Sequence, residues 1–178
     1  MYQIIFAGGI HGVGKSTLCR ELASELKLSY LSASELLKWK DLNAADKRNK
    51  KVIDIPDMQD RLINGLGLVV EPDKKYILDG HFCLFNKDGK VTKIPIETFE
   101  KINPSILILI TGDARDIALA LSKRDDRAYN PTDLDEMQNL EISYASEVAV
   151  HLNIPLIIHS KENNQISDLI NPVNESFT

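Results

Sequence analysis

The chain has 178 residues, 43% of them hydrophobic, which suits one ordinary domain with a single buried core. Its formal net charge of −5 and pI near 5.4 leave no overall basic field for a polyanion, so nucleic acid is not expected as a main partner. The N-terminal run lacks the basic flank of a signal peptide, and no apolar stretch approaches the roughly 20 residues that span a bilayer. We therefore expect a soluble protein without membrane contact. Cys19 and Cys83 lack metal-type spacing and are expected to be buried thiols of a reduced, cytoplasmic protein.

Short, continuous apolar runs recur along the chain and are typical of strands covered on both faces, as in a parallel sheet. They predict strands at residues 2–7, 28–31, 75–78, 105–110 and 154–158. Apolar residues at helical spacing predict helices from residue 15, at 33–40, around residues 58–66, between Pro95 and Pro104, and at 113–123, 132–152 and 166–170. Thr132 is expected to cap the longest helix, residues 86–89 to form a turn, and the tail from Pro172 to be loose. The alternation predicts a single α/β domain over residues 1–178 with a mostly parallel, five-stranded sheet.

The strongest motif lies between the first strand and the first helix. Residues 9–16 read GIHGVGKS and fit the pattern G-x-x-x-x-G-K-[ST] of a phosphate-binding loop, or P-loop. The glycines let successive backbone N–H groups face inward, and the helix that follows adds its positive N-terminal end, so phosphate oxygens find donors. The motif predicts a site for ATP and Mg²⁺ built from Gly9, His11, Gly12, Val13, Gly14, Lys15, Ser16 and Thr17.

Roles follow from the side chains of this loop. Lys15 is expected to reach the β- and γ-phosphates as a catalytic residue, and the Ser16 hydroxyl to ligate Mg²⁺. Thr17 is expected to support the α-phosphate. Asp79 ends the strand that reads YILD, where a carboxylate beside the loop holds Mg²⁺ through water; the alternative is a plain Asp-Gly turn. His81, two residues on, is a candidate to approach the acceptor substrate, and otherwise a structural or solvated histidine.

Two basic segments are candidates for further phosphate contacts. Residues 124–131 predict a charged loop, in which Arg124 and Arg127 could stack on a base and neutralise the transferred phosphoryl group. The alternative is an exposed, salt-bridged loop. The region between the second and third strands predicts a helical insert over the sheet, whose basic residues suit an acceptor that carries its own phosphate or form a solvated face. The insert's candidates are Lys47, Arg48, Lys50, Lys51 and Arg61, with Gln59 as a candidate partner for an acceptor base.

With these residues in place, the chain resembles the nucleoside monophosphate kinases, especially archaeal-type adenylate kinases, nearly from end to end. The P-loop, the segment PDMQ, the strand YILDGH, the run INPSILILIT and the loop at Arg124 and Arg127 follow in similar order. The resemblance implies a three-layer P-loop kinase fold with a five-stranded parallel sheet, an acceptor-binding insert at about 34–70 and a lid at about 124–131. It also implies transfer of the γ-phosphoryl group from ATP to AMP, with Arg124 stacking on adenine and Arg127 touching phosphates.

One departure concerns the acceptor. Many nucleotide kinases have an aromatic residue, a proline and a phosphate-binding arginine after the Asp-Gly pair, whereas this chain has His81-Phe82-Cys83. Arg48 or Arg61 could replace that arginine, or the acceptor is not a nucleotide. The lid lacks cysteines for zinc, and an N-K-x-D guanine motif is absent, which favours ATP. Two alternatives stay open: a P-loop kinase for another small acceptor, and an ATP-binding regulatory module.

Overall fold

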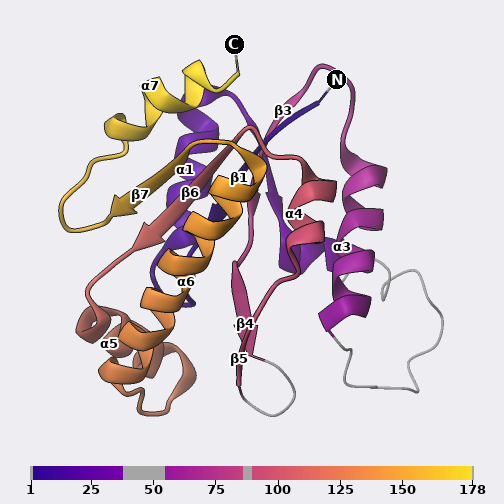
Figure 1. The fold of residues 1–178 in the computed structure, drawn as a ribbon. Helices are drawn as coiled ribbons and strands as arrows, with labels where there is room; N and C mark the ends of the chain where they lie inside the picture. Colours follow the sequence, from indigo (N-terminus) through magenta and orange to yellow (C-terminus); the bar gives the residue numbers. More distant parts are fainter. Residues whose placement is uncertain (1, 38–54, 86–89, 178) are drawn as a thin grey trace.

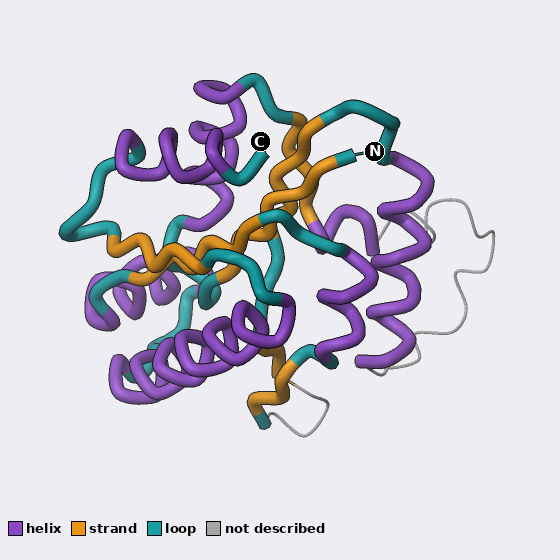
Figure 2. Tube along the Cα trace, turned by 45° about the horizontal axis from the view of Figure 1, so that its top comes forward, coloured by secondary structure: helices purple, strands orange, loops and turns teal. Residues whose placement is uncertain are grey.

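The computed structural model describes residues 2–37, 55–85 and 90–177. The turn predicted at 86–89 and the end of the helix predicted at 33–40 lie outside these ranges. Residues 33–37 are helical, as expected for that segment. The chain's two termini lie at the same end of the molecule (Figures 1 and 2).

The centre of the fold is a parallel sheet of five strands in the order β2-β3-β1-β6-β7. The strands are β1 (Gln3–Gly8), β2 (Ser29–Ser32), β3 (Lys75–Asp79), β6 (Ile106–Thr111) and β7 (Leu156–Ser160). The register pairs Ala7 of β1 with Asp79 of β3, and Ser32 of β2 with the same Asp79. The predicted α/β class with a five-stranded sheet is therefore confirmed, and the carboxyl end of β3 is brought beside the start of the P-loop.

Helices cover the sheet on both sides, which gives three layers (Figures 1 and 2). They are α1 (Lys15–Leu26), α3 (Ile55–Val69), α4 (Ile96–Ile102), α5 (Ala114–Asp125), α6 (Pro131–Leu152) and α7 (Ser167–Glu175). Alternate β1 residues point to opposite faces: Ile5 and Ala7 pack with α1, α5 and α7, whereas Ile4 and Phe6 pack with α3, α4 and α6. The inner strands β1, β3 and β6 are thus buried on both faces, which is why their sequences are mostly continuous apolar runs.

A short antiparallel hairpin of β4 (Cys83–Phe85) and β5 (Val91–Lys93) extends from the end of β3. Sequence patterns did not predict these strands, because three residues are too few to show alternation. Tyr144 of α6 donates a hydrogen bond to the carbonyl of Ile94, just after the hairpin. The hairpin is therefore tied to the same helix layer as α4 and α6.

The start of α6 differs from the prediction. Asn130, not Thr132, caps the helix: its side-chain oxygen accepts a hydrogen bond from the Thr132 N–H at 3.0 Å. Pro131 occupies the first helical position, where its fixed φ is favourable and its missing N–H would have no partner in any case. The cap therefore falls one residue before the proline.

Asn130→Ala should lower the free energy of unfolding by about 1 kcal/mol, because a first-turn N–H loses its acceptor. Thr132→Ala is the matched control, and it should leave stability within about 0.5 kcal/mol since Thr132 is exposed. Urea unfolding of the two variants checks the assignment. A larger loss of stability in the Thr132 variant would mean that Thr132 is the cap, as the sequence predicted.

The C-terminal segment is ordered in helix α7, against the expectation of a loose tail from Pro172. The proline lies inside the helix and lacks the N–H that would donate to the carbonyl four residues earlier. Burial outweighs this loss, since Leu169, Val173 and Phe177 pack into the core face that α1 also covers.

Cys19 and Cys83 are both buried free thiols, as predicted. Among the residues that the structure describes, no helix combines the length and apolarity needed to cross a bilayer.

Candidate functional site

The P-loop connects β1 to α1 in a conformation that requires glycine. Gly12 and Gly14 have φ of 81° and 91°, in the left-handed region that residues with a side chain rarely adopt. A Cβ atom at Gly12 would lie 2.6 Å from Cγ of Leu121, and one at Gly14 would lie 3.0 Å from the Lys161 ammonium nitrogen. Gly14 is also the N-cap of α1, so the first-turn N–H groups of this helix are presented by the loop. The loop is a cradle of the kind that binds phosphate.

A cavity of about 320 Å³, the loop cavity, opens over this cradle. Of the predicted nucleotide ligands, six line it: His11, Gly12, Gly14, Lys15, Ser16 and Thr17. Gly9 and Val13 do not line the loop cavity. The Val13 side chain is buried in the core, and the Gly9 carbonyl faces His81. Arg124 and its neighbours on α5 close the other side of the cavity.

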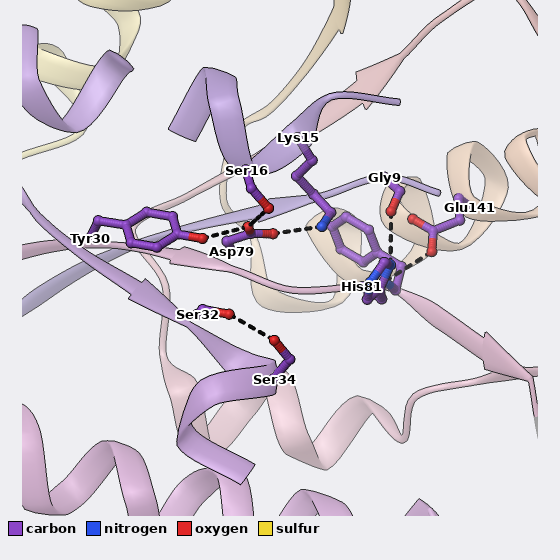
Figure 3. Close-up of polar contacts among 10 residues, drawn as sticks. Gly9, Lys15, Ser16, Tyr30, Ser32, Ser34, Asp79, His81 and Glu141 are labelled. Atoms are coloured by element: carbon purple, nitrogen blue, oxygen red, sulfur yellow. Dashed lines mark hydrogen bonds and ion pairs between the residues drawn. The ribbon is translucent and has the colours of Figure 1, made fainter. Parts of the chain in front are cut away.

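Asp79 is held by three side chains at the end of β3 (Figure 3). Its Oδ1 atom pairs with the Lys15 ammonium at 2.6 Å, and its Oδ2 atom accepts hydrogen bonds from Ser16 Oγ at 2.5 Å and from the Tyr30 hydroxyl at 2.8 Å. The carboxyl is 4% exposed. Burial alone would raise its pKa, but the Lys15 charge and the three hydrogen bonds lower it overall, so Asp79 is ionised.

The oxygen atoms at this point fit Mg²⁺. A serine hydroxyl and an ionised carboxylate lie together beside the phosphate cradle, and Mg²⁺ takes one or two such oxygens and completes its shell with waters and substrate phosphates. Within residues 2–37, 55–85 and 90–177, no cluster of three or more His, Cys, Asp or Glu side chains offers a metal cage.

Two histidine rings lie between the P-loop and a second cavity. The His11 and His81 ring centroids are 4.2 Å apart, and His81 Nδ1 lies 2.8 Å from the Gly9 carbonyl oxygen. Because a carbonyl only accepts hydrogen bonds, Nδ1 carries the proton of a neutral His81 ring. Burial, Lys15 and His11 lower the pKa of His81 to about 3, and burial, Lys15 and Arg124 also lower that of His11. Around neutral pH both rings are uncharged.

The second cavity, the apolar cavity, has a volume of about 220 Å³ and lies between residues 33–37, α3, β4 and α4. Its lining is mostly hydrocarbon, with five polar side chains: His11, Ser34, Gln59, His81 and Thr98. None of the lining residues that the structure describes is Lys or Arg. Gln59 is 7% exposed, and its Oε1 atom has no hydrogen-bond partner within the described residues. Gln59 and His81, the two described candidates for the acceptor that line a cavity here, therefore share the same one.

The other predicted acceptor residues are not brought to the apolar cavity. Arg61 is half-buried on α3 and does not line it. Arg48 and the basic group at 47–51 lie outside the described residues.

The predicted lid is only partly a loop. Arg124 and Asp125 belong to the last turn of α5, where a basic side chain is favourable, so the helix ends two residues later than predicted. Arg124 forms a two-point ion pair with Asp125, and the Tyr129 hydroxyl donates to the same carboxylate at 2.6 Å. Arg127 donates to the Tyr129 hydroxyl at 2.8 Å and stacks over its ring. Both arginines line a further cavity of about 240 Å³ with His11, so the lid faces the P-loop.

Two residues at the site were missed by sequence analysis, Tyr30 and Glu141. Tyr30 gave no signal, because a tyrosine in a strand is ordinary. Glu141 did give one: it lies on the face of α6 that buries Tyr144, Ala145 and Val148, three to seven residues away. A carboxylate on a buried helical stripe is rare and marks a special role.

Glu141 is fully buried beneath the segment that follows His81. Its Oε1 atom accepts hydrogen bonds from the N–H groups of Phe82 and Cys83, at 3.2 and 3.0 Å. Oε2 has no hydrogen-bond partner within the described residues, although the nearby Gly9 N–H favours the charged carboxyl. Burial dominates and raises the pKa of Glu141 to about 7.

Comparisons with known proteins agree with this geometry. No curated protein sequence matches the chain. Among solved structures, the chain is similar to a candidate kinase from Chloroflexus aurantiacus J-10-fl, with 14% identity, coverage of 99% of this chain and 98% of that one, and a TM-score of 0.62. It is also similar to a sugar kinase from Janibacter sp. HTCC2649 (14% identity, coverage 99% and 95%, TM-score 0.56) and to a gluconokinase from Sinorhizobium meliloti 1021 (10%, 98% and 90%, 0.52). At these identities the likeness shows the fold, which is that of P-loop kinases.

A family model described as an AAA domain matches residues 8–138. The matched stretch begins at the end of β1 and runs through the P-loop, Asp79 and the lid into α6. Because it covers well over half of the 178 residues, the chain belongs to this AAA domain family, with the fold of a P-loop kinase.

Proposed function

We propose that the chain is a phosphotransferase that moves the γ-phosphoryl group of Mg-ATP to a small acceptor. The observation that carries the proposal is the position of His11, which lines both the loop cavity and the apolar cavity. A phosphoryl group bound in the P-loop therefore has a second binding space directly beside it. An enzyme that only hydrolysed ATP would need no such space.

In this proposal, the chain's own residues supply positioning and charge. Lys15 exchanges the Asp79 carboxylate for the β- and γ-phosphate oxygens, and Ser16 turns its oxygen toward the cation that accompanies them. Mg²⁺, when bound, neutralises charge on the phosphates. Arg124 lines the loop cavity, and both Arg124 and Arg127 line the neighbouring cavity with His11, so closure of the lid would bring further positive charge to the transferred group. Holding the reactants in line accounts for most of the rate in such a mechanism.

The acceptor that we propose first is a nucleoside monophosphate, with AMP as the leading case. The support is Gln59, which lines a mostly hydrocarbon cavity and whose buried carbonyl oxygen has no hydrogen-bond partner among the described residues. A planar base suits such a lining, and its edge would satisfy the amide. The acceptor's phosphate would need cations from outside this lining, for which the insert residues around Arg48 are candidates.

A second acceptor class is an uncharged hydroxyl compound. It is favoured by the absence of Lys and Arg from the cavity lining that the structure describes. Sugar acids such as those suggested by the gluconokinase and sugar kinase neighbours fit less well, since a polyol needs many hydrogen-bond partners and this lining offers few.

An acceptor screen tests the proposal. The purified protein is incubated with Mg-ATP and, separately, with nucleoside monophosphates, deoxynucleotides, nucleosides, gluconate and related sugar acids, and both products are followed by ion-exchange chromatography. The kinase proposal predicts that one acceptor gains phosphate in step with ADP formation. If ATP binds but no compound is phosphorylated and hydrolysis stays slow, the chain is better described as an ATP-binding regulatory module.

Gln59→Leu tests the acceptor site itself. Leucine keeps the volume but loses the amide, so the acceptor KM should rise about tenfold while the ATP KM stays within twofold. Asn64→Leu, at an exposed position of the same helix, is the matched control and should change neither constant. Equal constants in wild type and the Gln59 variant would place the acceptor elsewhere.

A further inference from the structure

The Asp79 carboxylate is held by hydrogen bonds from side chains that are also expected to bind the nucleotide and its cation. Two of its three side-chain donors are Lys15 and Ser16, which also belong to the P-loop motif. In the proposed function, on which this inference rests, Lys15 moves to phosphate oxygens and Ser16 to the cation. Asp79 would then lose two of its hydrogen bonds at the moment when its own position matters most.

We propose that Tyr30 is a positioning residue that holds Asp79 in place for the magnesium ion throughout nucleotide binding. The Tyr30 hydroxyl is the third donor to Asp79, at 2.8 Å from Oδ2, and it lies outside the P-loop motif (Figure 3). Of the side-chain donors to Asp79 that the structure describes, it is the one that is not expected to move to a phosphate or to the cation.

The polarity of this hydrogen bond is fixed. Asp79 pairs with the Lys15 ammonium through Oδ1, and its carboxylate oxygens only accept, so the phenol donates to Oδ2. A protonated phenol against a carboxylate is a charge-assisted hydrogen bond, about twice as strong as a neutral one.

The ring of Tyr30 is itself held against helix α1. The Arg20 guanidinium lies 4.0 Å from the ring centroid. Arg20 follows Ser16 by four residues, so the two side chains lie on one face of α1. From the other side, strand β2 carries Tyr30 next to β3, where it pairs with Ile77, two residues before Asp79. Helix and sheet together therefore set the direction of the hydroxyl.

The consequence for Mg²⁺ follows from its strict geometry. Mg²⁺ demands a near-octahedral shell, and Asp79 is expected to reach it through a bound water. A carboxylate free to rotate would lose the alignment of that water. Outer partners of this kind change metal affinity or activity by about 10- to 100-fold when they are removed.

Tyr30→Phe removes only the hydroxyl and leaves the ring under Arg20. Binding of a fluorescent ATP analogue is measured by anisotropy, first without divalent cation and then as a function of Mg²⁺ concentration. We expect the Mg²⁺ concentration for half-maximal tightening to rise about tenfold, with the metal-free affinity unchanged within twofold. Tyr76→Phe is the matched control: its hydroxyl accepts from the Glu71 N–H, away from the P-loop, so its Mg²⁺ response should equal that of wild type.

A double-mutant cycle separates positioning from general destabilisation. In an Asp79→Asn background, Tyr30→Phe should have little further effect on the Mg²⁺ response, because the two residues act as one unit. Additive losses, an unchanged Mg²⁺ midpoint in Tyr30→Phe, or an equal loss with and without Mg²⁺ would each overturn the inference. So would a wild-type protein whose ATP binding ignores Mg²⁺.

These outcomes are distinct from failure of the kinase proposal. If an acceptor is phosphorylated and Tyr30→Phe behaves as wild type, the function stands and the role of Tyr30 is wrong. If the Mg²⁺ midpoint shifts as expected but no acceptor is ever phosphorylated, Tyr30 positions the cation in a protein that is not a kinase.

Discussion

Lys15→Ala should abolish ATP-dependent phosphoryl transfer, with a fall in kcat of about a thousandfold or more. The side chain is 8% exposed at the floor of the loop cavity and is the one cation in direct contact with Asp79 among the described residues. Without it, the site loses the motif's own ammonium group, which offsets the charge that spreads over the phosphoryl oxygens in the transition state. Turnover of the acceptor found in the screen, followed by ADP formation, is the measurement.

The same substitution leaves Asp79 buried without its ion pair, so folding must be checked alongside activity. Lys15→Met keeps the aliphatic stem and should lose activity to the same degree with a smaller loss of thermal stability. Lys74→Ala removes an exposed lysine whose partner is Glu71, and it should keep full activity. Full turnover by a folded Lys15 variant would refute the assignment of the loop as the donor site.

The sheet could be predicted from sequence because its signals are local and repeated. The run Ile106–Thr111 is buried at every position and apolar at all but the last, and parallel strands covered on both faces need that pattern. The P-loop was equally visible, since its glycines and its Lys-Ser pair lie within eight residues. The strand that ends at Asp79 runs parallel to β1, and its register pairs Asp79 with Ala7. The carboxylate therefore lies beside the start of the loop.

Other features depend on contacts between distant segments, which a single sequence does not reveal. Tyr30 and Asp79 are 49 residues apart, and their hydrogen bond exists only because β2 and β3 are neighbours in the sheet. Helix α7 continues past Pro172 because its side chains pack into a core to which α1 and α5 also contribute. Helix α5 extends two residues into the predicted lid, because Asp125 pairs with Arg124 within the last helical turn. The sequence alone looks like a polar loop at this point.

Glu141→Gln should stabilise the protein increasingly as the pH rises from about 4.5 to 7, relative to wild type. The pKa of Glu141 is raised from 4.5 to about 7 in the folded state, so the native protein holds this proton more tightly than the unfolded chain does. The stability from the neutral carboxyl is complete below pH 4.5 and is lost as the pH passes through 7. Integrated over this shift, the loss in wild type is of the order of 3 kcal/mol.

Glutamine keeps the hydrogen-bond acceptor of Glu141. Its side-chain oxygen can still accept the N–H groups of Phe82 and Cys83, and it carries no charge at any pH. Its amide group occupies the place of Oε2, which has no hydrogen-bond partner among the described residues, and this adds an offset that does not vary with pH. The prediction therefore concerns the slope of the difference between variant and wild type, not its absolute value.

Denaturant unfolding at intervals from pH 4.5 to 9 measures that slope. His81 acts in the opposite direction, because its pKa is lowered to about 3 and its contribution is present above pH 6.5 and lost toward acid. It is common to both proteins and cancels in the difference. Glu147→Gln, an exposed position on the same helix that pairs with Lys93, is the control and should give a flat difference. A flat difference for Glu141→Gln as well would mean that the buried carboxyl is ionised throughout, and that Lys15 and the Gly9 N–H stabilise its charge more than burial destabilises it.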